Sequence, residues 1–491
     1  MSEHPHVLLI STDHWPAALL GSASHPSILT PTLDELARSG TRFTNAYAEC
    51  PICIPARRTL MTGTPPKTHG DRVFKTNEPM PDVPTLAQTF RNAGYQAYGV
   101  GKLHVYPQRD RVGFDDVILA EEGRPHLGAI DDHDIFLSDE GFAGQAYAHG
   151  MSNNEYSFRP WHLPERTHVT NWATNQMCRM IKRRDPNRPG FWYLSFCHPH
   201  PPLVPLSCYL DLYSDIEIDN CFGGTWSSDP QMLPFALQQI VSKNSHINAT
   251  EIKRIRRAFY ALCTHIDHQL RLVLGTLREE GLLDDAILLF TSDHGDMLGN
   301  HGLWAKRLFY ESSANVPMIL VGGRNQRVAH HCVDHRLVAW RDVMPTLLDL
   351  AEIDIPKTVE GFSMVGSEKR DLLYGECGEG HTATRMIRNE RYKLIYYPTG
   401  NHLQLFDLQE DPCEKRDLST CDRHKSTLES LTTMLIKELY GEDMQWVSQK
   451  RLIGLPDLPH TPGPNKNLSG VRGIHFPPPP IDTSGSVVGI P

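Results

Sequence analysis

The segment ECPICIPARRTLMTG (residues 49–63) contains two overlapping patterns that imply different chemistry. Cys50-Pro-Ile-Cys53 has the C-x-x-C spacing of a redox dithiol or a metal clip. In the other interpretation, Cys53 stands alone at the start of a helix that has Pro55 in its first turn and ends at the last glycine. The N–H groups and the dipole of a helix N-terminus favour an anion. Arg57, one turn along, could bind two oxygens of a tetrahedral oxyanion there.

Four apolar runs elsewhere in the chain end in side chains that could bind a cation or a substrate. These side chains are Asp13 and His14, Lys102 and His104, His198 and His200, and Asp293 and His294. Continuous apolar runs are typical of strands buried on both faces of a parallel sheet. Ligands of open α/β sheets bind at the carboxyl ends of the strands. Carboxylates and imidazoles that meet at one such edge can hold a divalent cation.

Strands and helices alternate in the part of the chain that would position these residues. Strands are predicted for the runs HVLLIST, YQAYGVG, GFWYLSFC and AILLFTS. Helices are predicted at 31–39, between the N-cap Thr30 and Gly40, at 84–94, and at 250–281, where the pattern is long and amphipathic. This alternation indicates an α/β fold, in which a large sheet is flanked by helices.

The segment 123–188 has a different texture from the elements around it. It is rich in Asp, His and Gly and shows weak periodicity. We therefore predict insertions and loops here that shape access of the substrate.

The chain of 491 residues is too long for one ordinary core and divides into three parts. Residues 1–370 are predicted to form the catalytic α/β domain. From residue 371 two alternating strands with a hairpin precede a helix, which predicts a smaller α+β subdomain over 371–453. Residues 454–491 are too rich in Pro, Gly and Ser to hold a core, so they are predicted to be an extended or disordered tail, and a candidate arm for association of two copies of the chain.

Composition and charge exclude several classes of protein. The net charge is −10, and no Lys/Arg block indicates a nucleic-acid partner. The N-terminus lacks a signal peptide pattern, and no apolar run approaches the roughly 18–20 residues of a membrane span, so we expect a cytoplasmic protein with no membrane partner. Eleven cysteines spread thinly over the chain suit reduced thiols.

The segment Cys53-Ile-Pro-Ala-Arg57 resembles the C-x-P-[SA]-R motif of the type I sulfatases in the alkaline phosphatase superfamily. Further segments resemble that family in the same order: STD after the first strand, GKLH, HPHPP, SDHGDMLGNHGLWAKRLFYE and QLFDLQEDPCEKRDL. Together they cover residues 5–420. The resemblance implies an alkaline-phosphatase-like fold, with a large central mixed sheet flanked by helices and a smaller C-terminal α+β subdomain.

The resemblance also implies the reaction and its cofactors. A maturation enzyme would oxidise Cys53 to formylglycine (3-oxoalanine), whose hydrate attacks the sulfur of a sulfate ester beside one divalent metal ion. Family membership favours calcium, whereas imidazole ligands favour manganese or zinc.

Site residues are carried over from the family motifs one by one. Those implied at the metal are Asp13, Cys53, Asp293 and His294, together with His14, which either ligates the ion or hydrogen-bonds a ligand. Those implied in catalysis are Cys53, Arg57 beside the nucleophile, His104 on the hydrate hydroxyl, His200 near the leaving-group oxygen, and Lys102 and Lys306 on the sulfate oxygens. Lys102, His200 and Lys306 would therefore contact the substrate.

These inferences favour a sulfatase that acts on an aryl or carbohydrate sulfate, with a small-molecule or saccharide ester as its partner. A phosphonate monoester or phosphodiester hydrolase of the same superfamily is the first alternative, although its relatives tend to lack the pair formed by Lys102 and His104. An unmodified pseudoenzyme that binds sulfated ligands is the second. The sequence does not identify the alcohol part of the substrate.

Overall fold

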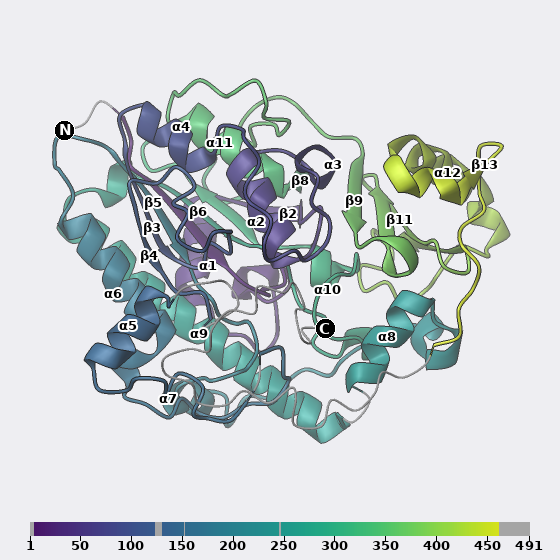
Figure 1. The fold of residues 1–491 in the computed structure, drawn as a ribbon, viewed down its shortest axis with the longest axis horizontal. Coiled ribbons are helices and arrows are strands. Elements are labelled where there is room, and N and C mark those ends of the chain that lie inside the picture. The colour runs from purple at the N-terminus through teal and green to yellow at the C-terminus, as the bar shows by residue number, and fades with distance from the viewer. Residues whose placement is uncertain (1–3, 123–129, 152, 245–246, 461–491) are drawn as a thin grey trace.

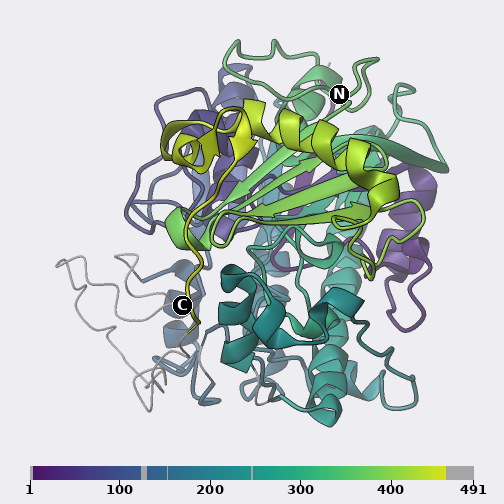
Figure 2. The same ribbon diagram turned by 90° about the vertical axis from the view of Figure 1, so that its right-hand side faces the viewer.

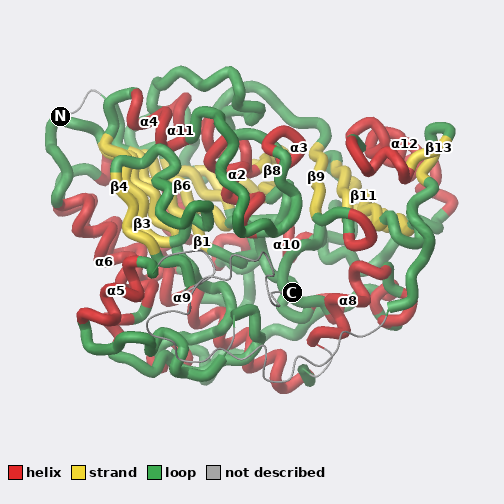
Figure 3. The backbone as a smooth tube through the Cα atoms, viewed as in Figure 1, coloured by secondary structure: helices red, strands yellow, loops and turns green. Residues whose placement is uncertain are grey.

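The computed structural model describes residues 4–122, 130–151, 153–244 and 247–460. An eight-stranded sheet forms its centre, with strand order β4-β3-β5-β1-β6-β7-β2-β8 (Figures 1 and 3). Only β7 runs antiparallel to its neighbours among these described strands, so the sheet is mixed, as predicted. The strands are β1 (Val7–Thr12), β2 (Thr41–Tyr47), β3 (Gln96–Gly101), β4 (Asp116–Leu119), β5 (Gly190–Ser195), β6 (Ile287–Ser292), β7 (Met318–Val321) and β8 (Cys332–Ala339).

The central strands β1, β5 and β6 are buried along their whole length because helices cover both faces of the sheet. In β1, Val7 and Leu9 pack into one core and Leu8 and Ile10 into the other. Residues of α2, α4 and α11 share the first core, and residues of α1, α6 and α9 share the second (Figure 1). These helices are α1 (Pro31–Ser39), α2 (Cys53–Thr62), α4 (Leu86–Asn92), α6 (Val169–Lys182), α9 (Ala249–Glu279) and α11 (Val343–Leu350).

Helix α1 begins and ends where the sequence predicted, but the residue that caps its N-terminus is not the predicted one. The Thr30 side chain makes no capping bond to the helix. Instead, the carboxylate of Asp267 in α9 accepts hydrogen bonds from the backbone N–H groups of Thr32 and Leu33, at 3.0 and 2.8 Å. A helix N-terminus must have its first N–H groups satisfied, and here a residue more than 200 positions away does so.

The prediction that 123–188 consists of loops was wrong for two parts of the segment. The structure has α5 (Asp132–Asp139) and α6 there, and α6 buries Trp172 and Met177 against the sheet. Its polar residues Thr170 and Thr174 are buried as well. Ala173, Met177 and Ile181 nevertheless recur at helical spacing, so the sequence carries the amphipathic pattern of a helix that the interpretation of the whole segment as loops overlooked.

A second sheet lies beside the first and carries the C-terminal part of the chain. Its four antiparallel strands have the order β12-β11-β10-β9, and α12 lies across them (Figure 2). This is the α+β subdomain that the resemblance implied. Its elements are β9 (Leu373–Cys377), β10 (Thr384–Arg388), β11 (Tyr392–Tyr397), β12 (His402–Asp407), α12 (Lys425–Glu438), β13 (Val447–Ser448) and β14 (Arg451–Leu452). The other α-helices of the described residues are α3 (Pro66–His69), α7 (Ser207–Asp211), α8 (Phe235–Asn244) and α10 (Glu311–Ala314).

The predicted tail begins within this subdomain. The backbone of Leu455 donates to Pro398 and accepts from Gly400, at 2.7 and 3.0 Å, which fixes the chain to the end of β11. Residues 461–491, which include most of the predicted association arm, lie outside the described residues. Within the described residues, none of the helices combines the length and apolar character needed to cross a bilayer.

Candidate active site

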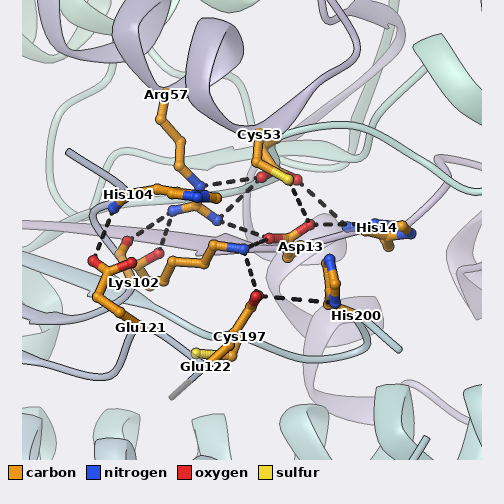
Figure 4. Close-up of polar contacts among 12 residues, drawn as sticks. Asp13, His14, Cys53, Arg57, Lys102, His104, Glu121, Glu122, Cys197 and His200 are labelled. Carbon is orange, nitrogen blue, oxygen red and sulfur yellow. Dashed lines mark hydrogen bonds and ion pairs between the residues drawn. The ribbon is translucent and has the colours of Figure 1, made fainter. Parts of the chain in front are cut away.

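The carboxyl ends of β1, β3, β5 and β6 meet at one edge of the large sheet because these strands are parallel and adjacent. They carry Asp13, Lys102, His200 and Asp293 to this edge, and all four side chains are buried there. The structure therefore brings these four residues together, and Figure 4 labels Asp13, Lys102 and His200 among them. The ring of His198, which the strand-end rule also selected, packs instead against that of His168, with 5.2 Å between the ring centres.

Helix α2 delivers Cys53 to the same place. Cys53 is the first residue of the helix, and Gly63 ends it in the left-handed conformation, with φ 65°. The redox interpretation of the C-x-x-C spacing finds no support, because the two sulfurs face different partners. Cys50 Sγ lies 3.7 Å from the carbonyl oxygen of Arg72, whereas Cys53 Sγ lies 3.3 Å from His294 Nε2.

Four potential ligand atoms surround a point beside Cys53. Those of Asp13, Cys53, Asp293 and His294 all lie within 4.8 Å of one another, and all four residues are fully buried. His294 Nε2 is 3.5 Å from the nearest oxygen of each aspartate. Two carboxylates and one imidazole suit a divalent cation such as manganese or zinc, whereas calcium prefers oxygen ligands alone. The residues present therefore fit the metal ion that the resemblance implies.

The side chain of His14 lies next to this group but outside it. Its Nε2 atom is 3.7 Å from Asp13 and 2.7 Å from Lys306 Nζ, and its Nδ1 atom is 2.6 Å from Asp296. A second candidate group of ligand atoms consists of Asp13, His14 and His200.

Two lysines and one arginine of the described residues bring positive charge to the site. Lys306 Nζ lies 2.8 Å from Cys53 Sγ, and Lys102 Nζ bonds to Asp13 and to Glu122. Arg57 is almost fully buried and directs its hydrogen bonds to protein groups. These groups are the Asp293 carboxylate at 3.1 Å, the Lys102 carbonyl at 2.8 Å and Ser195 Oγ at 2.7 Å. Arg57 thus holds the surroundings of Cys53 in place.

These charges shift the ionisation of the central groups. Burial opposes ionisation of Asp13, but Lys102 and Lys306 outweigh it and hold the pKa of this carboxyl well below its usual range. Burial likewise opposes the thiolate of Cys53, yet the same two lysines help to lower the pKa of the thiol. Burial also disfavours the charged form of His294, but Asp293 raises the pKa of that imidazole.

His200 and His104 are buried at the site as well. The Pro201 carbonyl accepts a hydrogen bond from His200 Nδ1 at 2.5 Å, and Nε2 of this buried ring has no hydrogen-bond partner among the described residues. His200 and Glu122 also line a cavity of about 60 Å³, which residues of the segment after α5 help to enclose. The His104 ring is buried, 5.5 Å from the ring of Phe74.

Two carboxylates next to the lysine were missed by the reasoning from sequence. Glu121 and Glu122 follow β4, the strand that pairs with β3 at the edge of the sheet. Glu121 Oε1 accepts the backbone N–H groups of Leu103 and His104, both at 2.8 Å (Figure 4). The strand-end rule could have found both residues, because β4 is short but is followed by polar side chains like the other parallel strands.

Comparison with known proteins identifies the family. A family model described as sulfatase matches residues 5–353, which is most of the chain. The chain belongs to the sulfatase family. A second model, for the C-terminal part of N-sulphoglucosamine sulphohydrolase, matches residues 299–441 of this sulfatase. Membership makes the protein a sulfuric ester hydrolase, as predicted.

Curated relatives agree with this assignment. The sulfatase is 34% identical over 468 residues to an arylsulfatase of Clostridium perfringens, covering 91% of this chain and 97% of that one. It is 30% identical over 438 residues to a choline-sulfatase of Rhizobium meliloti, covering 84% and 82%.

Solved structures share the fold. A phosphonate monoester hydrolase of Agrobacterium radiobacter superposes with a TM-score of 0.76 at 23% identity, covering 88% of this chain and 95% of that one. A protein solved with its substrate D-glucosamine-2-N,6-O-disulfate superposes with a TM-score of 0.69 at 19% identity, covering 89% and 97%. At these identities the likeness concerns the fold alone.

Proposed function

We propose that this sulfatase hydrolyses a sulfate monoester by means of a formylglycine made from Cys53. The observation that carries the proposal is the position of Cys53 Sγ at the start of α2, 2.8 Å from Lys306 Nζ and 3.3 Å from His294 Nε2. A nucleophile at this position has a cation and a helix N-terminus beside it, and both favour an anionic substrate.

Asp13, Asp293, His294 and the modified residue 53 would hold one divalent cation. When present, the cation supplies positive charge against the anionic ester, and hydrated formylglycine supplies a hydroxyl nucleophile in place of a thiol. Arg57 maintains the donor set by fixing Asp293 with a hydrogen bond of 3.1 Å.

Lys306 and Lys102 flank the position where the sulfate group must lie to meet residue 53. Both ammonium groups are buried, so their charge acts on the sulfate oxygens with little screening by water. They bind the ground state and also neutralise the charge that moves onto the leaving oxygen during cleavage.

We assign His200 to the leaving-group oxygen. Because the Pro201 carbonyl can only accept, Nδ1 of His200 carries a hydrogen and Nε2 of the neutral ring is an acceptor. His200 can therefore donate a proton only in its doubly protonated form. Burial holds the pKa of His200 well below its usual range, and the negative charge of a bound sulfate ester would raise it.

The relatives suggest an aryl sulfate as the first substrate to test. We expect purified enzyme with bound metal to hydrolyse a nitrophenyl sulfate, and Cys53→Ala, with the same metal content, to be inactive. The same preparation should turn over a phenyl phosphonate monoester less efficiently. A strong preference for the phosphonate would assign the chain to the alternative reaction, and binding of sulfate esters without turnover would indicate a pseudoenzyme.

A further inference from the structure

A continuous series of buried polar contacts runs from Tyr156 to Cys53. Tyr156 Oη donates to Asp296 Oδ2 at 2.5 Å, and the same oxygen lies 2.6 Å from His14 Nδ1. His14 Nε2 lies 2.7 Å from Lys306 Nζ, which in turn lies 2.8 Å from Cys53 Sγ. All five side chains are less than a tenth exposed, so these contacts are shielded from bulk water.

The chemistry of the partners fixes the direction of each hydrogen bond. Asp296 accepts from Tyr156 and, through its other oxygen, from the backbone N–H of Leu298 at 2.9 Å. Its carboxylate therefore accepts from His14 Nδ1 as well, and the hydrogen of the neutral ring resides on Nδ1. Nε2 then carries a lone pair, and an ammonium group such as that of Lys306 can only donate to it.

Lys306 needs such an acceptor because its ammonium group is buried. The local backbone does not fix the position of this lysine. It lies between Ala305 and Arg307, which both have left-handed φ angles, 62° and 74°. The lysine is therefore part of neither a helix nor a strand. Among the described residues, its hydrogen bonds to His14 and Cys53 are what determine where the ammonium group lies.

The same geometry argues against His14 as a metal ligand. Its ring is not among the four residues whose ligand atoms cluster around Cys53. A cation on its Nε2 atom would have to displace Lys306 Nζ from 2.7 Å or accept a like charge beside it. The alternative group of Asp13, His14 and His200 meets the same obstacle.

We propose that His14 is a positioning residue that holds Lys306 for binding of the sulfate group, with its tautomer set by Asp296 and Tyr156. The proposal rests on the proposed function in one respect, the assignment of Lys306 to the sulfate oxygens. In this chain, the imidazole after the first metal-binding aspartate then serves the substrate and not the ion.

Two variants separate the positioning role from ligation. In His14→Asn the amide can occupy the position of Nδ1 and keep the contact with Asp296, and Asn tolerates the left-handed backbone, φ 71°, found here. The side chain is too short to reach Lys306. In Asp296→Asn an amide N–H can donate to Nδ1 of His14, so that the hydrogen of the neutral ring moves to Nε2. Nε2 is then a donor and can no longer accept a hydrogen bond from Lys306.

We expect both variants to bind one manganese ion per chain, with a dissociation constant within about threefold of that of the enzyme without substitutions. Sulfate binding should weaken about tenfold or more, because one charge-assisted contact is lost. The readouts are metal content after dialysis, a manganese titration, the inhibition constant of inorganic sulfate, and KM separately from kcat for a nitrophenyl sulfate. Asp293→Asn serves as the control that loses metal.

A fall in manganese affinity of about 10–100-fold in either variant would identify His14 as a ligand and overturn the proposal, since outer partners of a ligating imidazole have effects of that size. Unchanged sulfate inhibition in both variants would overturn it as well. Should His14→Asn fail to fold, Asp296→Asn retains the histidine and gives the same test. Failure of the enzyme without substitutions to hydrolyse any sulfate ester would contradict the proposed function, while the manganese titration would still decide the role of His14.

Discussion

Glu121 provides a test of how the site is held together. Its carboxylate oxygen Oε1 accepts the backbone N–H groups of Leu103 and His104, and its own N–H donates to Asp131 at 2.6 Å. His104 has a left-handed φ of 59°, a conformation that non-glycine residues rarely adopt. The turn that directs Lys102 into the site therefore depends on this buried acceptor.

The cost of removing the acceptor follows from the geometry. Glu121 is 1% exposed, so Glu121→Ala would leave two buried N–H groups with no acceptor and no access to bulk water. At about 1–3 kcal/mol for each unsatisfied donor, the free energy of unfolding should fall by about 2–6 kcal/mol. A shift of Lys102 by about 1 Å would reduce kcat/KM for an aryl sulfate on the order of 100-fold.

Glu121→Gln is the matched control because its amide oxygen can accept both N–H groups. Burial raises the pKa of Glu121 to about 7, so the neutral amide is also a fair substitute for the carboxyl near neutral pH. We expect this variant to keep the stability of the enzyme without substitutions, and its kcat/KM to stay within about threefold of that enzyme's value. Denaturant unfolding and steady-state kinetics make the comparison. Equal losses in both variants, or none in either, would refute the argument that the acceptor positions the turn.

Three further predictions concern other parts of the account. Cys53→Ala should abolish turnover of an aryl sulfate, while the circular dichroism spectrum and the melting temperature stay close to those of the enzyme without substitutions. Residual turnover would place the nucleophile elsewhere. Lys102→Ala should raise the inhibition constant of inorganic sulfate while the metal content, measured by mass spectrometry, is retained. Burial lowers the pKa of His265 from 6.5 to about 3, so the unfolded chain binds more protons below pH 6.5. This imidazole should then cost about 2 kcal/mol of stability on going from pH 7 to pH 5, and His265→Gln should reduce the acid destabilisation seen by denaturant unfolding.

The strand-end residues were predictable from sequence because parallel strands share an edge. Asp13 and Asp293 follow continuous apolar runs, and the sheet order places β1 next to β6. Cys53 was predictable for another local reason, since Pro55 in the first turn marks the start of a helix. In these cases a few neighbouring residues carry the information.

Other parts of the site depend on contacts between distant residues. Lys306 lies in an irregular loop, so no periodicity predicts where its ammonium group lies, and only the family motif pointed to it. The contact between Tyr156 and Asp296 joins residues 140 positions apart. Helix α6 buries the polar side chains of Thr170 and Thr174 beside its apolar residues. Tertiary packing satisfies such polar groups, and a local pattern does not record it.

The central claim is that Cys53 becomes the aldehyde that performs the attack. The most direct measurement is the mass of the proteolytic peptide that contains Cys53, taken from preparations whose specific activity toward an aryl sulfate is known. We predict the aldehyde, reactive toward hydrazides, in a fraction that rises in proportion to activity across preparations. A fully active preparation in which this residue is entirely an unmodified thiol would contradict the account.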